Sequence, residues 1–267
     1  STSRGLGDVY KRQIFNGTDM LIAAHCEVQE TIKTNIEKYK QKYKGADDIP
    51  VSAHPNIRSV PACYASSELA VRLAKIAGAR LHILHVSTAK ELQLFSDEPL
   101  ASKNITAEAC VAHLLFTLTH YNSLGTRIKC NPAVKRKTDR EALRAAVNSG
   151  LIDVIATDHA PHLLNEKEGG ALKAMSGMPM IQFSLVSMLE LVDKGVFSLE
   201  TVVQKMCHAP ARIYGICHRG YIREGYQADL VLVRPNSPWE VSADKILSKC
   251  GWSPLEAVSY THLRAHE

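Results

Sequence analysis

The sequence lacks any apolar run close to the ~20 residues that a membrane-spanning helix requires. Residues 1–13 also lack the apolar stretch of a signal peptide. Hydrophobic residues make up 45% of the 267 positions and charged residues 22%, as is ordinary for a globular enzyme. We therefore expect a globular enzyme that has no membrane partner.

Closely spaced cysteine pairs are missing as well. The seven cysteines are scattered singly, as Cys26, Cys63, Cys110, Cys130, Cys207, Cys217 and Cys250. An odd set without a C-x-x-C pair argues against a zinc knuckle and is typical of reduced thiols in a cytoplasmic protein. We expect Cys26 and Cys110 to be small buried residues.

A strong charge of one sign is also absent. The formal net charge is only +5, and part of the basic excess lies in the two ends of the chain. This balance gives no reason to expect a nucleic-acid partner.

The two ends lack the periodicity of a helix or a strand. Residues 1–13 and 258–267 resemble translated sequencing-adapter sequence, and we set both aside as adapter-like tails. Residues 14–257 are then expected to be a gene fragment.

Within that interior, four short apolar runs alternate with helical patterns. The runs are MLIAAHCE (20–27), RLHILHVS (80–87), NITAEACV (104–111) and IDVIATD (152–158). The longer helical patterns cover about residues 30–43, 64–77, 139–149 and 180–194. This alternation predicts parallel β/α units, and apolar residues on both faces suit strands that are buried on two sides. GYQADLVLVRP (225–235) predicts a further strand in a small, separate β domain.

In three of the four runs, a histidine or an aspartate follows the apolar residues at or near the end of the run. His25, His85 and Asp158 each follow two apolar residues that alternation places on the same face. In a (β/α)8 barrel the active site is built at this end of the strands. Two histidines and a carboxylate suit zinc or a similar divalent ion. The sequence therefore predicts a metal site of these three residues.

The second run contains another histidine. Strict alternation groups Leu81, Ile83 and His85 and leaves His82 on the opposite face, against the helices. We therefore predict no ligand role for His82.

These segments carry a family resemblance. AHCE (24–27), HVS (85–87) and ATDHAPH (156–162) resemble three successive metal and catalytic segments of the dihydroorotases, cyclic amidohydrolases of the amidohydrolase superfamily. The similarity continues through TAEACVAHL (106–114), CNPAVK (130–135), GMP (177–179), HAPARIYGI (208–216) and GYQADLVLV (225–233). ATDHAPH is the most specific segment, since hydantoinase-like and allantoinase-like relatives usually lack its final histidine.

The resemblance implies a reversible, zinc-dependent hydrolysis of dihydroorotate to N-carbamoyl-aspartate in de novo pyrimidine biosynthesis. It implies that His25 and His85 bind one zinc of a two-zinc centre, while Asp158 binds the other and shuttles the proton.

The resemblance also implies residues that bind the small-molecule substrate. His162 resembles the residue that contacts the substrate carboxylate, while Asn131 and Pro179 lie in segments that resemble substrate-binding loops. Asn131 is interpreted equally well as a plain turn residue, because Asn-Pro favours turns. Glu108 is either a support for a neighbouring ligand or simply a polar residue at a strand end.

The family's first metal motif, His-x-His, is not in this sequence, nor are its bridging ligand and its substrate-binding arginine. We therefore expect an α/β fold, a partial (β/α)8 TIM barrel of the last four strands over residues 14–218. Part of a composite β domain is expected over residues 219–257. Such a fragment should be inactive alone.

Other functions remain open. One is a dihydropyrimidinase-, hydantoinase- or allantoinase-like cyclic amidohydrolase, and another is a non-catalytic homologue that keeps the barrel as a structural subunit. A homo-oligomer is compatible with each of them.

Overall fold

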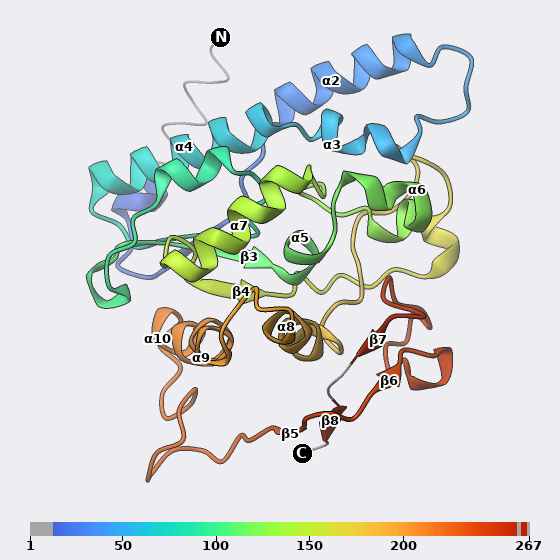
Figure 1. Ribbon diagram of the computed structural model, residues 1–267. Coiled ribbons are helices and arrows are strands. Elements are labelled where there is room, and N and C mark those ends of the chain that lie inside the picture. The colour runs from blue at the N-terminus through green and yellow to red at the C-terminus, as the bar shows by residue number, and fades with distance from the viewer. Residues whose placement is uncertain (1–12, 261–262, 266–267) are drawn as a thin grey trace.

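The structure is a computed structural model that describes residues 13–260 and 263–265 (Figure 1). The first adapter-like tail therefore lies outside the described residues, except for Gln13.

Four parallel strands form the central sheet, and each lies within one of the four predicted runs. They are β1 Ile22–Ala24, β2 Leu81–Ile83, β3 Ile105–Cys110 and β4 Val154–Ala156. They pair in the order β1-β2-β3-β4, so each strand lies beside its successor in the chain. Parallel neighbours need a crossover connection, which here contains helices. The prediction of an α/β fold on a parallel sheet is confirmed.

Helices cover both faces of this sheet. They are α2 Gln29–Lys42, α3 His54–Ile57, α4 Val60–Ala77, α5 Val111–Leu115, α6 Tyr121–Leu124, α7 Lys137–Ser149, α8 Ser184–Asp193, α9 Leu199–Val203 and α10 Ala209–Ile213. Short 3₁₀ turns cover Val51–Ala53, Lys90–Leu94, Leu100–Ser102, Leu118–His120, Gly125–Ile128, Leu164–Lys167 and Ala243–Lys245, and a π-helical turn covers Gln204–His208. Figure 1 shows α4 and α7 on one side of the sheet and α9 and α10 on the other. None of the helices in the described ranges is long and apolar enough to cross a membrane.

Helix α4 shows how local sequence sets an element that positions the site. It begins with a proline in its first turn and ends at Gly78, whose left-handed φ of 64° closes the helix. Its buried side contributes Val71 and Leu73 to the same hydrophobic core as Leu81 and Ile83 of β2, and α4 contacts β2. The helix thus helps to hold the strand that precedes His85.

Strict alternation describes β2 only as far as Ile83, where the strand ends. Leu81 and Ile83 belong to the main hydrophobic core, and the His82 ring lies 5.6 Å from the ring of Tyr214, directly after helix α10. Beyond the strand, the backbone of His85 turns to a φ of 38°, so alternation does not set the direction of its side chain. Alternation holds only within regular strand geometry, and it stops before His85.

Helix α8 starts later than the sequence predicts, at Ser184 instead of about residue 180. Met178 forms a parallel bridge with His159, and the amide of Ala160 donates to the Met178 carbonyl at 3.0 Å. This extended pairing keeps the residues just before α8 out of the helix. It also holds two of the predicted site segments side by side.

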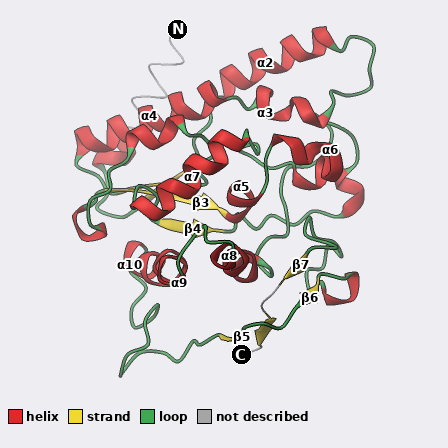
Figure 2. Ribbon diagram, in the orientation of Figure 1, coloured by secondary structure: helices red, strands yellow, loops and turns green. Residues whose placement is uncertain are grey.

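The C-terminal part forms two small antiparallel pairs apart from the central sheet (Figure 2). β5 Leu232–Arg234 lies in the predicted strand 225–235 and pairs with β8 Leu263–Ala265, while β6 Trp239–Glu240 pairs with β7 Ser259–Tyr260. Tyr260 is buried, and its hydroxyl lies 2.8 Å from the Ser187 hydroxyl of α8. Residues 259–260, set aside above as part of a tail, thus take part in the packing.

Candidate functional site

The candidate site lies just beyond the carboxyl ends of the strands. His85 and Asp158 follow β2 and β4, and both have left-handed backbones, with φ of 38° and 45°. Such φ values are uncommon for residues other than glycine and concentrate at functional sites. His25 follows β1 directly. Each predicted metal ligand therefore starts from an equivalent end of a strand.

His25 and His85 come into direct contact. The Nδ1 atom of His25 lies 2.8 Å from the Nε2 atom of His85, and the ring planes meet at 76°. Two nitrogens bound to one tetrahedral zinc would be about 3.3 Å apart, given Zn–N bonds of ~2.0–2.1 Å. In the structure the two nitrogens face each other at hydrogen-bond distance, about 0.5 Å closer than two ligands of one zinc ion would be.

The charge state of His85 suits this role. Burial, together with the neighbouring His25, lowers the pKa of His85 to about 4. The ring is therefore neutral near pH 7, and neutral imidazole is the form that binds a metal. Its Nδ1 atom is buried without a hydrogen-bond partner among the described residues.

Glu27 supports His25 on the ring nitrogen that does not face His85, a role that the sequence did not predict. Its Oε2 atom lies 3.2 Å from Nε2 of His25, and the same carboxylate forms an ion pair with Arg58. Burial alone would raise the pKa of Glu27, but the hydrogen bond from His25 and the charges of Arg58 and Lys135 lower it overall. A carboxylate on the far nitrogen of a ligand histidine fixes the orientation of the ring. The signal was present in AHCE, where an acidic residue stands two places after the histidine.

The Glu27–Arg58 pair gives a stability prediction. The Glu27 side chain is fully buried and that of Arg58 is 18% exposed. Replacing Arg58 by alanine leaves a buried carboxylate without its main partner, so we expect the free energy of unfolding to fall by about 3 kcal/mol. Urea denaturation of the chain measures this.

The matched control for that prediction is the double variant Glu27→Gln/Arg58→Ala, which removes both charges. It should recover most of the lost stability, because no buried charge is left unpaired. Equal losses in the single and the double variant would contradict this explanation.

Glu108 of β3 supports His85. Its Oε1 atom accepts a hydrogen bond from the His85 backbone amide at 3.2 Å, and its Oε2 atom lies 3.1 Å from Nε2 of His82. His82 in turn contacts the Thr106 hydroxyl at 2.8 Å through Nδ1. Of the two interpretations open for Glu108, the structure favours a support for a neighbouring ligand. His82 helps to hold Glu108 in place through its Nε2 atom.

Asp158 is not drawn into the histidine pair. Asp158 is exposed at the surface of the described chain. Its pKa is nevertheless raised, first because the surrounding protein partly removes water from the carboxylate and then because the Glu108 charge lies nearby; the charge of His25 acts in the opposite direction. Among residues 13–260 and 263–265, no group of three His, Cys, Asp or Glu side chains is placed to hold a metal ion. The structure therefore brings together His25 and His85 of the predicted set and places Asp158 only within electrostatic range.

The predicted substrate residues Asn131, His162 and Pro179 fall in three separate loops. Nε2 of His162 lies 3.1 Å from the Ser176 carbonyl, and its Nδ1 lies 3.8 Å from Glu166. Pro179 is buried in the segment that pairs with residues 159–160. The Oδ1 atom of Asn131 lies 3.1 Å from Nε2 of His54, a buried histidine that the sequence analysis did not single out.

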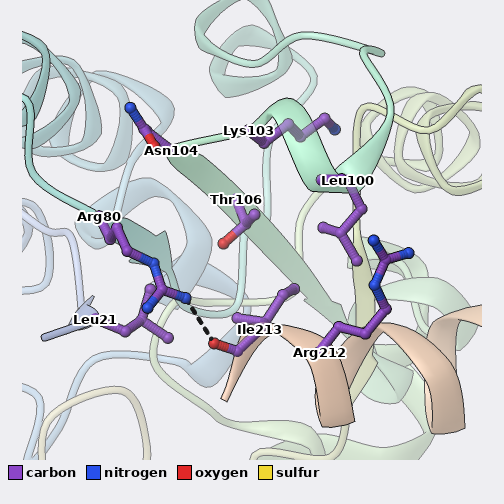
Figure 3. Close-up of a pocket in the computed structure, with 9 residues that line it drawn as sticks. Leu21, Arg80, Leu100, Lys103, Asn104, Thr106, Arg212 and Ile213 are labelled. Atoms are coloured by element: carbon purple, nitrogen blue, oxygen red, sulfur yellow. Dashed lines mark hydrogen bonds between the residues drawn. The ribbon is translucent and has the colours of Figure 1, made fainter. Parts of the chain in front are cut away.

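A separate cavity of about 240 Å³ lies at the other end of the strands (Figure 3). Its lining includes Arg80 and Asn104, which directly precede β2 and β3, and Ile213, whose carbonyl accepts a hydrogen bond from Arg80 at 3.0 Å. None of the predicted site residues lines it. The candidate active site is therefore at the carboxyl ends of the strands and not in this cavity.

Residues 16–250 match the amidohydrolase family. The chain is 34% identical over 221 residues to the dihydroorotase of Geobacter metallireducens, covering 79% of this chain and 51% of that protein. It is 38% identical over 183 residues to the dihydroorotase of Aquifex aeolicus, covering 68% of this chain and 43% of that protein. The chain thus spans about half the length of the curated relatives that it matches.

Among solved structures, the L-hydantoinase (dihydropyrimidinase) from Arthrobacter aurescens superposes with a TM-score of 0.89 at 27% identity. The superposition covers 96% of this chain and 58% of that one. A D-hydantoinase superposes with a TM-score of 0.86 at 20% identity, which supports the fold alone. The chain belongs to the amidohydrolase family and is a homologue of the dihydroorotases.

Proposed function

We propose that this protein is a dihydroorotase, which opens dihydroorotate to N-carbamoyl-aspartate and closes the ring in reverse. The observation that carries the proposal is the contact between Nδ1 of His25 and Nε2 of His85 at the carboxyl ends of neighbouring parallel strands. The identities of 34% and 38% to two dihydroorotases support this substrate.

The order and direction of the four strands support the proposal that they are part of a larger barrel. We propose that the four strands are consecutive strands of a (β/α)8 barrel, because they run parallel in chain order and carry the site at their carboxyl ends. β1 and β4 are the outer strands of this sheet, so further strands would pair with them. Additional metal and substrate groups would come from those strands, consistent with the 51% of the Geobacter relative that the chain covers.

The side chains of the site have distinct roles in this proposal. His25 and His85 would hold a zinc ion, and Asp158 would bind a second one. When bound, zinc polarises the amide carbonyl and makes water a stronger nucleophile at neutral pH. Glu27 keeps the His25 ring in place, and Glu108 fixes the backbone at His85.

Proton transfer is assigned to Asp158. Its carboxylate takes a proton from the attacking water and delivers it to the ring nitrogen as the C–N bond of the amide breaks. The second proton of the water leaves the new carboxyl group for solvent, so the product carries a new carboxylate, and its nitrogen carries the transferred hydrogen. In the reverse direction the same carboxyl group takes that hydrogen back.

A second candidate is a hydantoinase- or dihydropyrimidinase-like activity, which the TM-score of 0.89 to the L-hydantoinase favours. The substrate separates the two, since dihydroorotate carries a carboxylate that dihydrouracil lacks. His162 is the residue in this chain that would recognise that group.

His162 therefore gives a selectivity prediction. When protonated, it can donate through Nδ1 to a substrate carboxylate while Nε2 stays on the Ser176 carbonyl. Because a charge-assisted hydrogen bond contributes about 1.5–3 kcal/mol, His162→Ala should reduce the preference for dihydroorotate over dihydrouracil about 10- to 100-fold. The ratio of kcat/KM for the two substrates measures this.

His218→Ala is the matched control, because His218 is exposed and lies outside the site. It should leave the ratio unchanged. A wild-type protein that prefers dihydrouracil would move the assignment to the dihydropyrimidinase activity.

A further inference from the structure

The turn that carries Asn131 is held between two buried histidines. Nε2 of His54 lies 3.0 Å from the Cys130 carbonyl, and Nε2 of His113 lies 2.9 Å from the Pro132 carbonyl. Each histidine is only 3% exposed. Carbonyl oxygens can only accept hydrogen bonds, so both Nε2 atoms must carry the hydrogen.

This tautomer fixes the orientation of the Asn131 amide. Nε2 of His54 also lies 3.1 Å from the Asn131 side chain. Because that nitrogen carries a hydrogen, the Asn131 atom that faces it must be the amide oxygen. The NH2 group of Asn131 is then directed elsewhere, and no acceptor in the described part of the chain takes its hydrogens. Burial lowers the pKa of His54 to about 3, so the ring stays neutral in this arrangement.

Asn131 also lines a cavity of about 350 Å³. The polar part of the lining includes Arg58, Lys129 and Ser176, and no described acidic side chain lines it. Arg58 connects this cavity to the candidate site, since it forms the ion pair with the carboxylate that holds His25. The wall beside the site is therefore rich in hydrogen-bond donors.

We propose that His54 is a positioning residue that makes Asn131 a donor of hydrogen bonds only, and that this selects ligands presenting a carbonyl or carboxylate oxygen there. The inference rests on the proposed function and on the substrate contact of Asn131 that the resemblance of residues 130–135 implies. His113 holds the backbone of the same turn but does not touch the Asn131 amide, so it provides a matched comparison.

The first test needs no ligand. In the ¹⁵N-labelled chain, the His54 ring should show the Nε2–H tautomer, and the two side-chain amide hydrogens of Asn131 should give separate, shifted resonances. His54→Leu should shift them towards the values of an exposed asparagine. His54→Gln, which keeps a donor near the Nε2 position, should restore them. His113→Leu should leave them in place, and an equal shift in that variant would overturn the proposal.

The second test is a double-mutant cycle on dihydroorotate binding to the zinc-loaded protein, measured by calorimetry. His54→Leu should weaken binding about 10-fold, the effect of losing one hydrogen bond. In an Asn131→Ala background the same substitution should have no further effect. A similar loss in both backgrounds would show that His54 acts through another group, and would overturn the proposal alone. Unchanged binding in Asn131→Ala would show that Asn131 does not contact the substrate and would overturn the proposed selection, while the proposed function would still stand on His25, His85 and Asp158.

Discussion

Replacing Asp158 by asparagine should lower kcat for the ring opening of dihydroorotate about 1,000-fold, because positioned proton transfer contributes ~10²–10⁴. Asparagine has nearly the same shape but cannot take the proton from water or deliver it to the leaving nitrogen. Substrate affinity should change little, so KM should stay within about threefold if the lost interaction exists only in the transition state. Steady-state kinetics of the protein that carries this chain, in both directions and at saturating zinc, measure the effect; saturating zinc is needed because Asp158 is also proposed to bind the second zinc ion.

Asp97→Asn is the control for this substitution, because Asp97 is exposed and lies away from the strand ends that carry the site. It should leave kcat unchanged. A fall of less than about tenfold in Asp158→Asn would remove Asp158 from the proton-transfer role.

The sequence predicted the strand ends well, and the reason is physical. A strand buried on both faces needs apolar residues throughout, so a histidine or aspartate at its end is conspicuous. Each of the four runs contains one of the strands β1 to β4, and His25 and His85 meet just beyond the ends of the parallel neighbours β1 and β2. The position of a strand end can therefore be predicted from a few consecutive residues.

The supporting groups could not be predicted in the same way. Glu27 and Arg58 are 31 residues apart, and His54 and Asn131 are 77 residues apart. Their contacts depend on how α3 and the loops pack over the strand ends, and no local pattern encodes that packing. Glu108 was noticed as a polar residue on a strand, but its two partners became clear only from the register of β2 and β3.

The direction of the His85 side chain could not be predicted for the same reason. Alternation assumes that a strand continues to the residue in question, and β2 stops at Ile83. The left-handed backbone at His85, held by the hydrogen bond to Glu108, is a tertiary effect. The direction of a side chain just beyond a short strand is therefore set by its tertiary contacts and not by the alternation of faces along the strand.

The second large effect concerns zinc. Removing a group that only supports a metal ligand lowers affinity about 10- to 100-fold, so removing a ligand itself should cost at least about 100-fold. His25→Ala and His85→Ala should each lower the zinc affinity of the chain by at least this factor. Glu27→Gln loosens His25 without removing a ligand, so its zinc affinity should lie between the affinities of these variants and that of the wild type.

The central claim is that His25 and His85 form a metal site, and zinc titration against a chromophoric chelator tests it most directly. The wild-type chain and the His218→Ala control should bind zinc with the same affinity, while His25→Ala/His85→Ala should lose at least about 100-fold of it, with an unchanged circular dichroism spectrum. Equal zinc affinity in the wild-type chain and the folded double variant would contradict the account.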